Sequence, residues 1–76
     1  MSIRDSATGR YERKDVVSGL YEFWMGETRG KAVMVHFGKV GTPGHTGSRE
    51  FKTIDAAKEF LLDRLRKKIE EGYQQV

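Results

Sequence analysis

The stretch LYEFWMGETRGKAVMVHFG, residues 20–38, decides the fold. Its first part is rich in aromatic residues and its second part in β-branched and aromatic ones, and both compositions are typical of strands. Thr28, Arg29 and Gly30 form a short connection between the two parts, with glycine where a positive φ is expected. The stretch therefore predicts a β-hairpin.

The alternation of side chains along this hairpin sets its two faces. Val33, Val35 and Phe37 are expected to share one face of the second strand. Trp24 lies on a face of the first strand that also carries Glu22, so we expect a half-buried ring with one edge in water. Phe37 has two interpretations here: a core side chain beside the two valines, or a ring that meets a ligand where the strand ends.

The segments on either side of the hairpin complete a small sheet and a helix. Residues 10–15 (RYERKD) predict a charged edge strand, and residues 48–52 (SREFK) predict a short fourth strand. The residues between Thr53 and Gly72 predict a helix, with Thr53 as its N-cap and Gly72 just past its end. The apolar stripe that packs this helix on the sheet contains Ile54, Ala57, Leu61, Leu65 and Ile69.

These elements define the fold class and the domain boundaries. We expect an α+β fold, a small antiparallel sheet of about four strands in a meander with one C-terminal amphipathic helix packed on one face. Residues 1–9 are polar without periodicity and are expected to be a flexible N-terminus. Residues 10–76 are expected to form a single domain, with Tyr73 folded back onto the core.

Composition limits the compartment and the partners. The chain has no cysteine, which favours a reducing compartment, so we expect a cytoplasmic protein. The first residues show no export signal and no apolar run reaches the length of a membrane span, so no membrane partner is expected. A net charge of +3 permits binding to a polyanion without requiring it. We expect a monomer.

The glycine-rich segment VHFGKVGTPGHTGS, residues 35–48, is not a phosphate-binding loop. A strand follows it where a P-loop requires a helix, and Gly47 is followed directly by Ser48, with no lysine between them. His36 and His45 have no cysteine and no evident third ligand beside them, so neither a metal site nor a cofactor is expected. No arrangement of serine, histidine and carboxylate is evident, so we expect no catalysis. The Pro43-Gly44 pair predicts a type II turn.

Several segments, taken in order, resemble the WGR domain family. The triplet Trp-Gly-Arg that names the family reads Phe37-Gly38-Lys39 here and continues as VGTPG, residues 40–44. The upstream EFW, the downstream REFKTIDAAKEF and the closing KKIEEGY are also similar to the family. The resemblance covers about residues 10–73 and includes the small stand-alone bacterial members of the family.

The resemblance implies a nucleic-acid-binding module without enzymatic activity, because WGR domains take part in DNA-break recognition in poly(ADP-ribose) polymerases. It implies DNA rather than RNA as the ligand. Phe37 stands where the family's tryptophan can stack at a DNA end, and Lys39 stands where its arginine meets phosphate or a partner domain. Phenylalanine lacks the indole donor and lysine lacks the planar fork of arginine, so generic phosphate attraction is expected here.

The candidate nucleic-acid-binding residues are Trp24, Phe37, Gly38, Lys39 and Arg49. Gly38 either forms a bulge that turns Phe37 outward or relieves crowding where the strand ends. Lys39 is either a phosphate contact or an ordinary solvated lysine. A basic cluster on the helix is either a solvated helix end or the rim of a phosphate-tracking surface, and contains Arg64, Arg66, Lys67 and Lys68.

The alternative function is a protein-interaction module without direct nucleic-acid binding. It would use the glycine-rich loop and the sheet edge to dock a protein partner or to self-associate. The two functions differ in their response to salt, because phosphate binding releases counterions and weakens steeply as salt rises. A protein interface responds to salt only through the charges at its rim.

Overall fold

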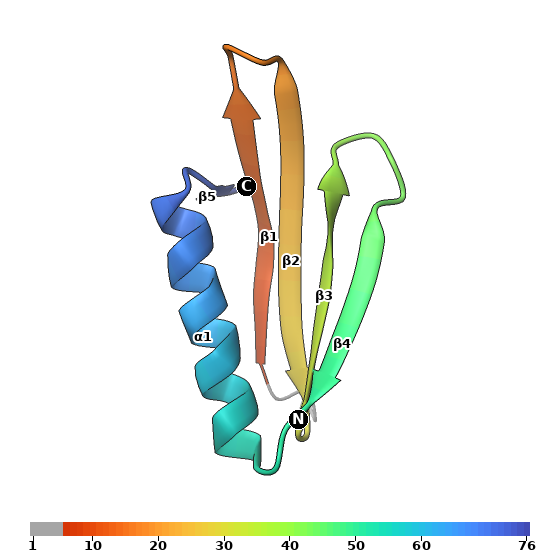
Figure 1. Cartoon of the computed structure of the whole chain (residues 1–76), viewed down its shortest axis with the longest axis vertical. Helices are drawn as coiled ribbons and strands as arrows, with labels where there is room; N and C mark the ends of the chain where they lie inside the picture. The colour runs from red at the N-terminus through yellow and green to blue at the C-terminus, as the bar shows by residue number, and fades with distance from the viewer. Residues whose placement is uncertain (1–5) are drawn as a thin grey trace.

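Five strands and one helix make up the domain in this computed structural model, which describes residues 6–76 and the side chains from residue 8 onward. The strands form one antiparallel sheet in the order β4-β3-β2-β1-β5, and α1 (Ile54–Glu70) lies along one face of it (Figure 1). The predicted α+β class is confirmed. The strands are β1 Ser6–Asp15, β2 Leu20–Arg29, β3 Ala32–Lys39, β4 His45–Glu50 and β5 Gln74–Gln75.

The sheet has one strand more than the sequence predicted. β5 contains two residues and pairs with the middle of β1, where Tyr11 faces Gln75 and Glu12 faces Gln74. So short a strand has no periodic pattern, which is why the sequence did not predict it. Because β5 covers part of the outer side of β1, the edge strand predicted at residues 10–15 is an edge over only part of its length.

The two outer strands of the prediction begin earlier than expected. β1 starts at Ser6, inside the segment expected to be flexible, and residues 1–5 of that segment lie outside the described residues. β4 starts at His45 rather than Ser48, since the ladder with β3 runs from the Phe37 and His45 pair to the Ala32 and Glu50 pair. The connection between β3 and β4 is therefore confined to residues 40–44.

The predicted central hairpin is confirmed, and its register decides which side chains face the helix. Trp24 lies opposite Phe37, and Thr28 lies opposite Val33. Directly paired residues of antiparallel strands point to the same face, so Trp24, Phe37 and Val33 share the face that α1 covers. The turn consists of Gly30, at a φ of 58°, and Lys31. The predicted connection at Thr28–Gly30 is wrong, because Thr28 and Arg29 still pair with β3.

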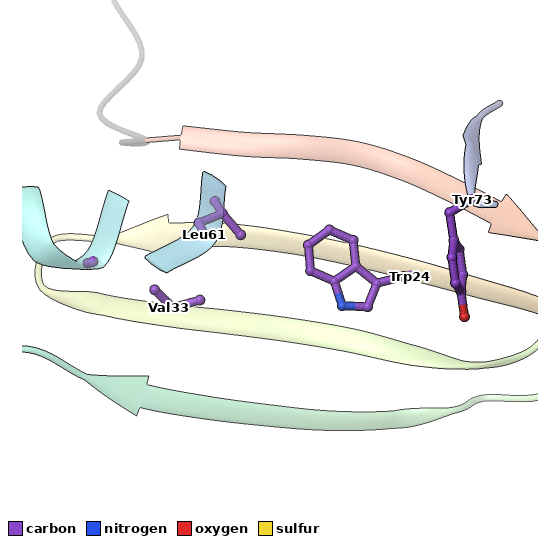
Figure 2. Packing of buried hydrophobic residues seen from close by; sticks show 5 residues of the cluster. Trp24, Val33, Leu61 and Tyr73 are labelled. Atoms are coloured by element: carbon purple, nitrogen blue, oxygen red, sulfur yellow. The ribbon is translucent and has the colours of Figure 1, made fainter. Parts of the chain in front are cut away.

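The core lies between α1 and this face. It consists of Trp24, Val33, Ala57, Leu61 and Tyr73, four of which are labelled in Figure 2. Trp24 is 4% exposed rather than half-buried. Its burial is possible because Gly26 has no side chain: a Cβ there would lie 2.7 Å from Cδ1 of Leu61 and 3.1 Å from Cη2 of Trp24. The helix therefore packs directly over the indole.

The two ends of α1 are fixed as the sequence predicted. The Thr53 hydroxyl accepts a hydrogen bond from the Ala56 amide at 3.0 Å, and Gly72 follows the helix at a φ of 105°. Tyr73 then folds back and is buried. The outer members of the predicted stripe, Ile54 and Ile69, are exposed, because the stripe drifts round the helix and only its middle turns rest on the sheet.

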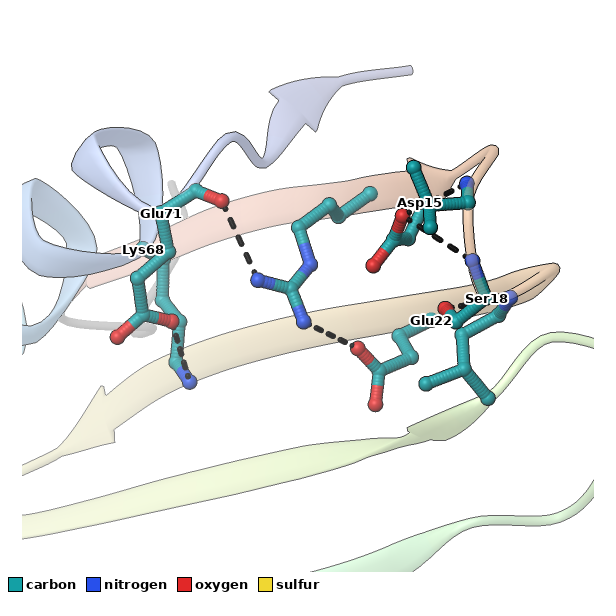
Figure 3. A network of polar contacts seen from close by, with 8 residues as sticks. Asp15, Ser18, Glu22, Lys68 and Glu71 are labelled. Atoms are coloured by element: carbon teal, nitrogen blue, oxygen red, sulfur yellow. Dashed lines mark hydrogen bonds and ion pairs between the residues drawn. The ribbon is translucent and has the colours of Figure 1, made fainter.

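Polar contacts attach the C-terminal end of α1 to the sheet. Arg13 donates from Nη2 to Oε1 of Glu22 at 2.7 Å and from Nη1 to the carbonyl of Glu71 at 3.3 Å (Figure 3). Its guanidinium lies 5.2 Å from the centre of the Tyr73 ring. The bond to Glu22 raises the pKa of Arg13, and burial raises the pKa of Tyr73. Arg13 is therefore charged and Tyr73 is neutral at neutral pH.

Candidate nucleic-acid interface

The residues 40–44 loop folds onto the sheet face opposite α1 and closes a second small core there. Phe23 is 2% exposed although it points away from the helix. Its ring is covered by the Arg10 guanidinium at 4.4 Å and by the His36 ring at 5.0 Å. A Cβ on Gly44 would lie 2.7 Å from Cζ of Phe23, so the loop backbone rests directly on the ring.

Two glycines allow this close approach. Gly38 has a φ of 154°, and a Cβ there would lie 2.7 Å from Cα of Gly44. Gly44 has a φ of 73°, and a Cβ there would lie 2.5 Å from the Phe37 carbonyl oxygen. The turn predicted at Pro43-Gly44 is not found there: the hydrogen-bonded turn of this loop runs from Lys39 to Thr42, whose amide donates to the Lys39 carbonyl at 3.1 Å. The pairing of Phe23 with Gly38 continues the ladder without a shift. Gly38 therefore relieves crowding rather than forming a bulge.

Phe37 lies on the helix-covered face of β3 but is not buried there. Its side chain is 41% exposed, and its ring centre lies 5.9 Å from that of His45 at an angle of 43°. Phe37 is paired in the register with the buried Trp24, and both side chains line the same groove. The structure therefore contradicts the interpretation of Phe37 as a buried core side chain, and its contact with a ligand stays a prediction.

A groove of about 340 Å³ extends from Phe37 along the boundary between the sheet and the helix. Its floor comes from β2 and β3 and contains Trp24, Val33 and Val35 as well as the Phe37 ring. Gly47 of β4 lies opposite Val35 in the register and has no side chain, so it leaves part of the half-buried valine open to the groove. The groove is called the β3–α1 groove below; the residues bordering it are Gly47, Ser48 and Arg49 on β4, and Phe60, Arg64 and Lys68 on α1.

Three cationic side chains border the β3–α1 groove. Arg64 and Lys68 follow Phe60 at intervals of four residues, which places the three on one stripe of α1. The guanidinium groups of Arg49 and Arg64 lie 5.4 and 5.0 Å from the centre of the Phe60 ring. Neither arginine forms an ion pair with any side chain described from residue 8 onward. Lys68 pairs with Glu71 at 3.5 Å, so the two arginines supply most of the uncompensated charge.

Comparison with known proteins identifies the family. The family model of the WGR domain matches residues 9–76. The chain belongs to the WGR domain family. A crystal structure of a protein from Bacteroides fragilis is similar to it, with a TM-score of 0.83 and 27% identity over 88% of this chain. The chain spans only 18% of the length of that protein, and no curated protein matches it.

The triplet of this WGR domain contributes to the site unequally. Phe37 forms part of the groove floor, whereas Gly38 packs against Gly44 and does not line the groove. Lys39 lies two residues beyond Phe37 on the same face, exposed at the end of β3. It faces Glu22, whose carboxylate already accepts from Arg13 at 2.7 Å. Lys39 therefore extends the positive border beyond the groove without lining it.

The predicted site residues are only partly brought together. Arg49 borders the WGR domain's groove with Phe37, as the candidate set requires, but Trp24 contributes only a buried floor. The predicted basic cluster of α1 divides: Arg64 and Lys68 reach the groove, and Lys67 pairs with Asp63 at 3.6 Å. Phe60 was not among the candidate residues. The spacing of residues 60, 64 and 68 was the signal that could have selected it.

The described part of this WGR domain shows no arrangement for metal chemistry. Among residues 6–76, no three histidine, cysteine, aspartate or glutamate side chains are placed to hold a metal ion. In the same part of the chain, the helix is neither long nor apolar enough to cross a membrane. The groove is suited to binding a ligand, because it has an accessible aromatic ring between cationic side chains.

Proposed function

We propose that this WGR domain is a non-enzymatic nucleic-acid-binding module that binds DNA through backbone phosphates and an aromatic contact at Phe37. The observation that carries the proposal is the β3–α1 groove, where Arg49 and Arg64 have no ion-pair partner among the described side chains and flank an apolar floor. Arginine in this state attracts phosphate, and an exposed aromatic ring provides a stacking surface.

The substitutions in the triplet set the character of the binding. Lysine at position 39 offers a point charge on a flexible stem, so it contributes attraction without bidentate geometry. The planar guanidinium groups of Arg49 and Arg64 supply that geometry from β4 and α1 instead. The charge that contacts the backbone is therefore carried mainly by the groove, and the triplet contributes the aromatic surface.

Fluorescence anisotropy with a labelled duplex that carries a single-stranded overhang tests this function. Three phosphate contacts, one for each cationic side chain at the groove, predict a slope of about −2.7 in log affinity against log salt. Affinity should therefore fall about 40-fold between about 50 and 200 mM salt. Arg49→Ala and Arg64→Ala should each reduce the slope by about 1. Arg66→Ala is the matched control, since Arg66 borders a different hollow beside Asp63. Absence of binding at low salt, or equal slopes for all variants, would refute the proposal.

A second candidate, a protein-interaction module, is favoured by the tip of the β1–β2 hairpin. This hairpin extends beyond β3 and β4 (Figure 1) and carries Val16 and Val17, which are 82% and 94% exposed. The turn is ordered, because the Val17 and Ser18 amides donate to Oδ1 of Asp15 at 3.0 and 3.4 Å and the Gly19 amide donates to its carbonyl at 2.7 Å. A fixed turn that presents two valines to water is suited to an apolar contact.

Sedimentation velocity over a concentration series tests the second candidate for self-association. If the tip mediates contact between two copies, the sedimentation coefficient rises with concentration, and the V16S and V17S double variant abolishes the rise. A constant monomer value for the wild-type chain at every concentration would contradict this candidate. The double variant leaves the groove intact, so DNA affinity should not change under the first proposal.

A further inference from the structure

The β3–α1 groove offers more than attraction for phosphate. A surface that only tracks a nucleic-acid backbone needs cations, yet this groove combines its cations with a floor of tryptophan, valine and phenylalanine side chains. The Phe37 ring is accessible inside the groove, and Gly47 leaves part of the half-buried Val35 open to it. The apolar floor therefore calls for a ligand group that is itself apolar and flat.

We infer that the β3–α1 groove holds one unpaired base of a nucleic-acid strand, with the base against Phe37 and Val35 and the adjacent phosphates at Arg49 and Arg64. This inference rests on the proposed nucleic-acid binding and adds the part of the strand that enters the groove. A volume of about 340 Å³ is at the low end for ligand pockets, so it suits one ring system rather than a stacked pair.

The positions of the charges fit a strand that crosses the groove. Arg49 comes from β4 on one side, and Arg64 and Lys68 come from α1 on the other. A nucleotide has a flat base and flanking phosphates, so the base can rest on the floor while a phosphate meets each border. His45 and Lys39 lie at the Phe37 end of the groove and continue a polar, cationic path for the next phosphate.

The same charges argue against an apolar peptide side chain as the occupant. Burying Arg49 and Arg64 under an uncharged segment would desolvate two cations that have no ion-pair partner among the described side chains. Phosphates supply the missing counter-charge. An intact duplex also fits poorly, since its bases are stacked and paired and cannot lie on the Phe37 ring inside a groove.

The test compares two oligonucleotides that differ only in their bases. Oligothymidylate of about 10 nucleotides and an abasic strand of the same length and charge are titrated at low salt. Loss of one stacked base should weaken binding about fivefold to hundredfold. Trp24, the only tryptophan, forms part of the floor, so its fluorescence should change with oligothymidylate and not with the abasic strand.

Gly47→Val fills the groove without removing a charge. A Cβ at Gly47 would lie 3.6 Å from Cγ2 of Val35, which is an ordinary contact, and Val suits a strand, so the variant should fold. It should bind both oligonucleotides equally, at the level of the abasic strand. Thr46→Val, at the neighbouring position on the opposite face of β4, is the matched control and should keep the preference for oligothymidylate.

The outcomes separate this inference from the proposed function. Equal, salt-dependent binding of both strands by the wild-type domain would overturn the base site and leave phosphate binding standing. If the domain binds neither oligonucleotide nor duplex, both the base site and the proposed nucleic-acid binding are overturned. Inorganic polyphosphate that competes as well as oligothymidylate at equal charge would show that the groove reads charge alone, which also overturns the base site.

Discussion

Gly44→Ala should destabilise the domain strongly, because this glycine holds the loop against both the β3 backbone and Phe23. The added Cβ would lie 2.5 Å from the Phe37 carbonyl oxygen and 2.7 Å from Cζ of Phe23. Neither atom can move away easily, since one belongs to the β3 backbone and the other to a ring that is 2% exposed.

The expected loss is the sum of a conformational and a steric contribution. A φ of 73° costs alanine about 1–2 kcal/mol relative to glycine. Insertion of a methyl group into a packed site costs about 1–3 kcal/mol more. The free energy of unfolding of a 76-residue chain is about 4–11 kcal/mol, so the variant loses a large fraction of it. The melting temperature should fall by about 10 °C or more.

Urea unfolding followed by circular dichroism measures this loss, with Gly41→Ala as the matched control. Gly41 lies in the same loop at a φ of 92°, but no atom lies within 4 Å of its Cβ position. Its variant should therefore show the conformational contribution alone, about 1–2 kcal/mol. Equal losses for the two variants, or a fully stable Gly44→Ala, would refute the argument that the loop packs directly on Phe23.

Three further predictions concern stability. Thr28→Val should raise the free energy of unfolding by about 1 kcal/mol in a urea titration. The reason is that the buried Thr28 hydroxyl has no hydrogen-bond partner in the part of the chain that the structure describes. A lower free energy of unfolding for the variant would contradict this. Thr53→Ala should remove the N-cap and cost about 0.5–2 kcal/mol, whereas Thr53→Ser should cost less. Arg10, at 2.7 Å, and the Tyr21 hydroxyl, at 2.8 Å, donate to Glu12 and hold its pKa below the ordinary 4.5. Its contribution to stability is therefore complete above about pH 4.5 and lost as the pH falls through the lowered pKa; a carboxyl NMR titration should give a low midpoint that Arg10→Met raises.

The elements that local pattern specifies were predictable from the sequence. The aromatic and β-branched residues 20–38 predicted the hairpin, and Thr53 and Gly72 predicted the limits of the helix. β5 was missed because two glutamines have no periodicity and pair with β1 only after Tyr73 has folded back. Its formation depends on tertiary contacts, which no local pattern encodes.

The burial of the aromatic residues shows what strand alternation can and cannot predict. The alternation of side chains along β3 placed Phe37 on the face of Val33 and Val35, but the exposure of Phe37 depends on where the helix lies above β3. Trp24 was expected to be half-buried and is buried, because Gly26 lets Leu61 approach the indole. Phe23 is buried on the face without a helix, through a loop that folds over it. In each case a distant segment decides the burial of the ring.

The basic border of the groove could be recognised only from the fold. Arg49 and Arg64 are separated by 15 positions and meet only because β4 and α1 both adjoin the Phe60 ring. Sequence spacing could place Arg64 and Lys68 on one stripe, but it could not show that Arg66 and Lys67 point elsewhere. The convergence of charge on an aromatic floor is a tertiary property.

Amide chemical-shift mapping with oligothymidylate at low salt tests the central claim, that the β3–α1 groove is the binding surface. The claim predicts that the largest shifts cluster at Phe37, at residues 47–49 of β4 and at residues 60–68 of α1. Shifts confined to the opposite face of the sheet, around Met34 and His36, or to the hairpin tip at Val16 and Val17, would contradict it.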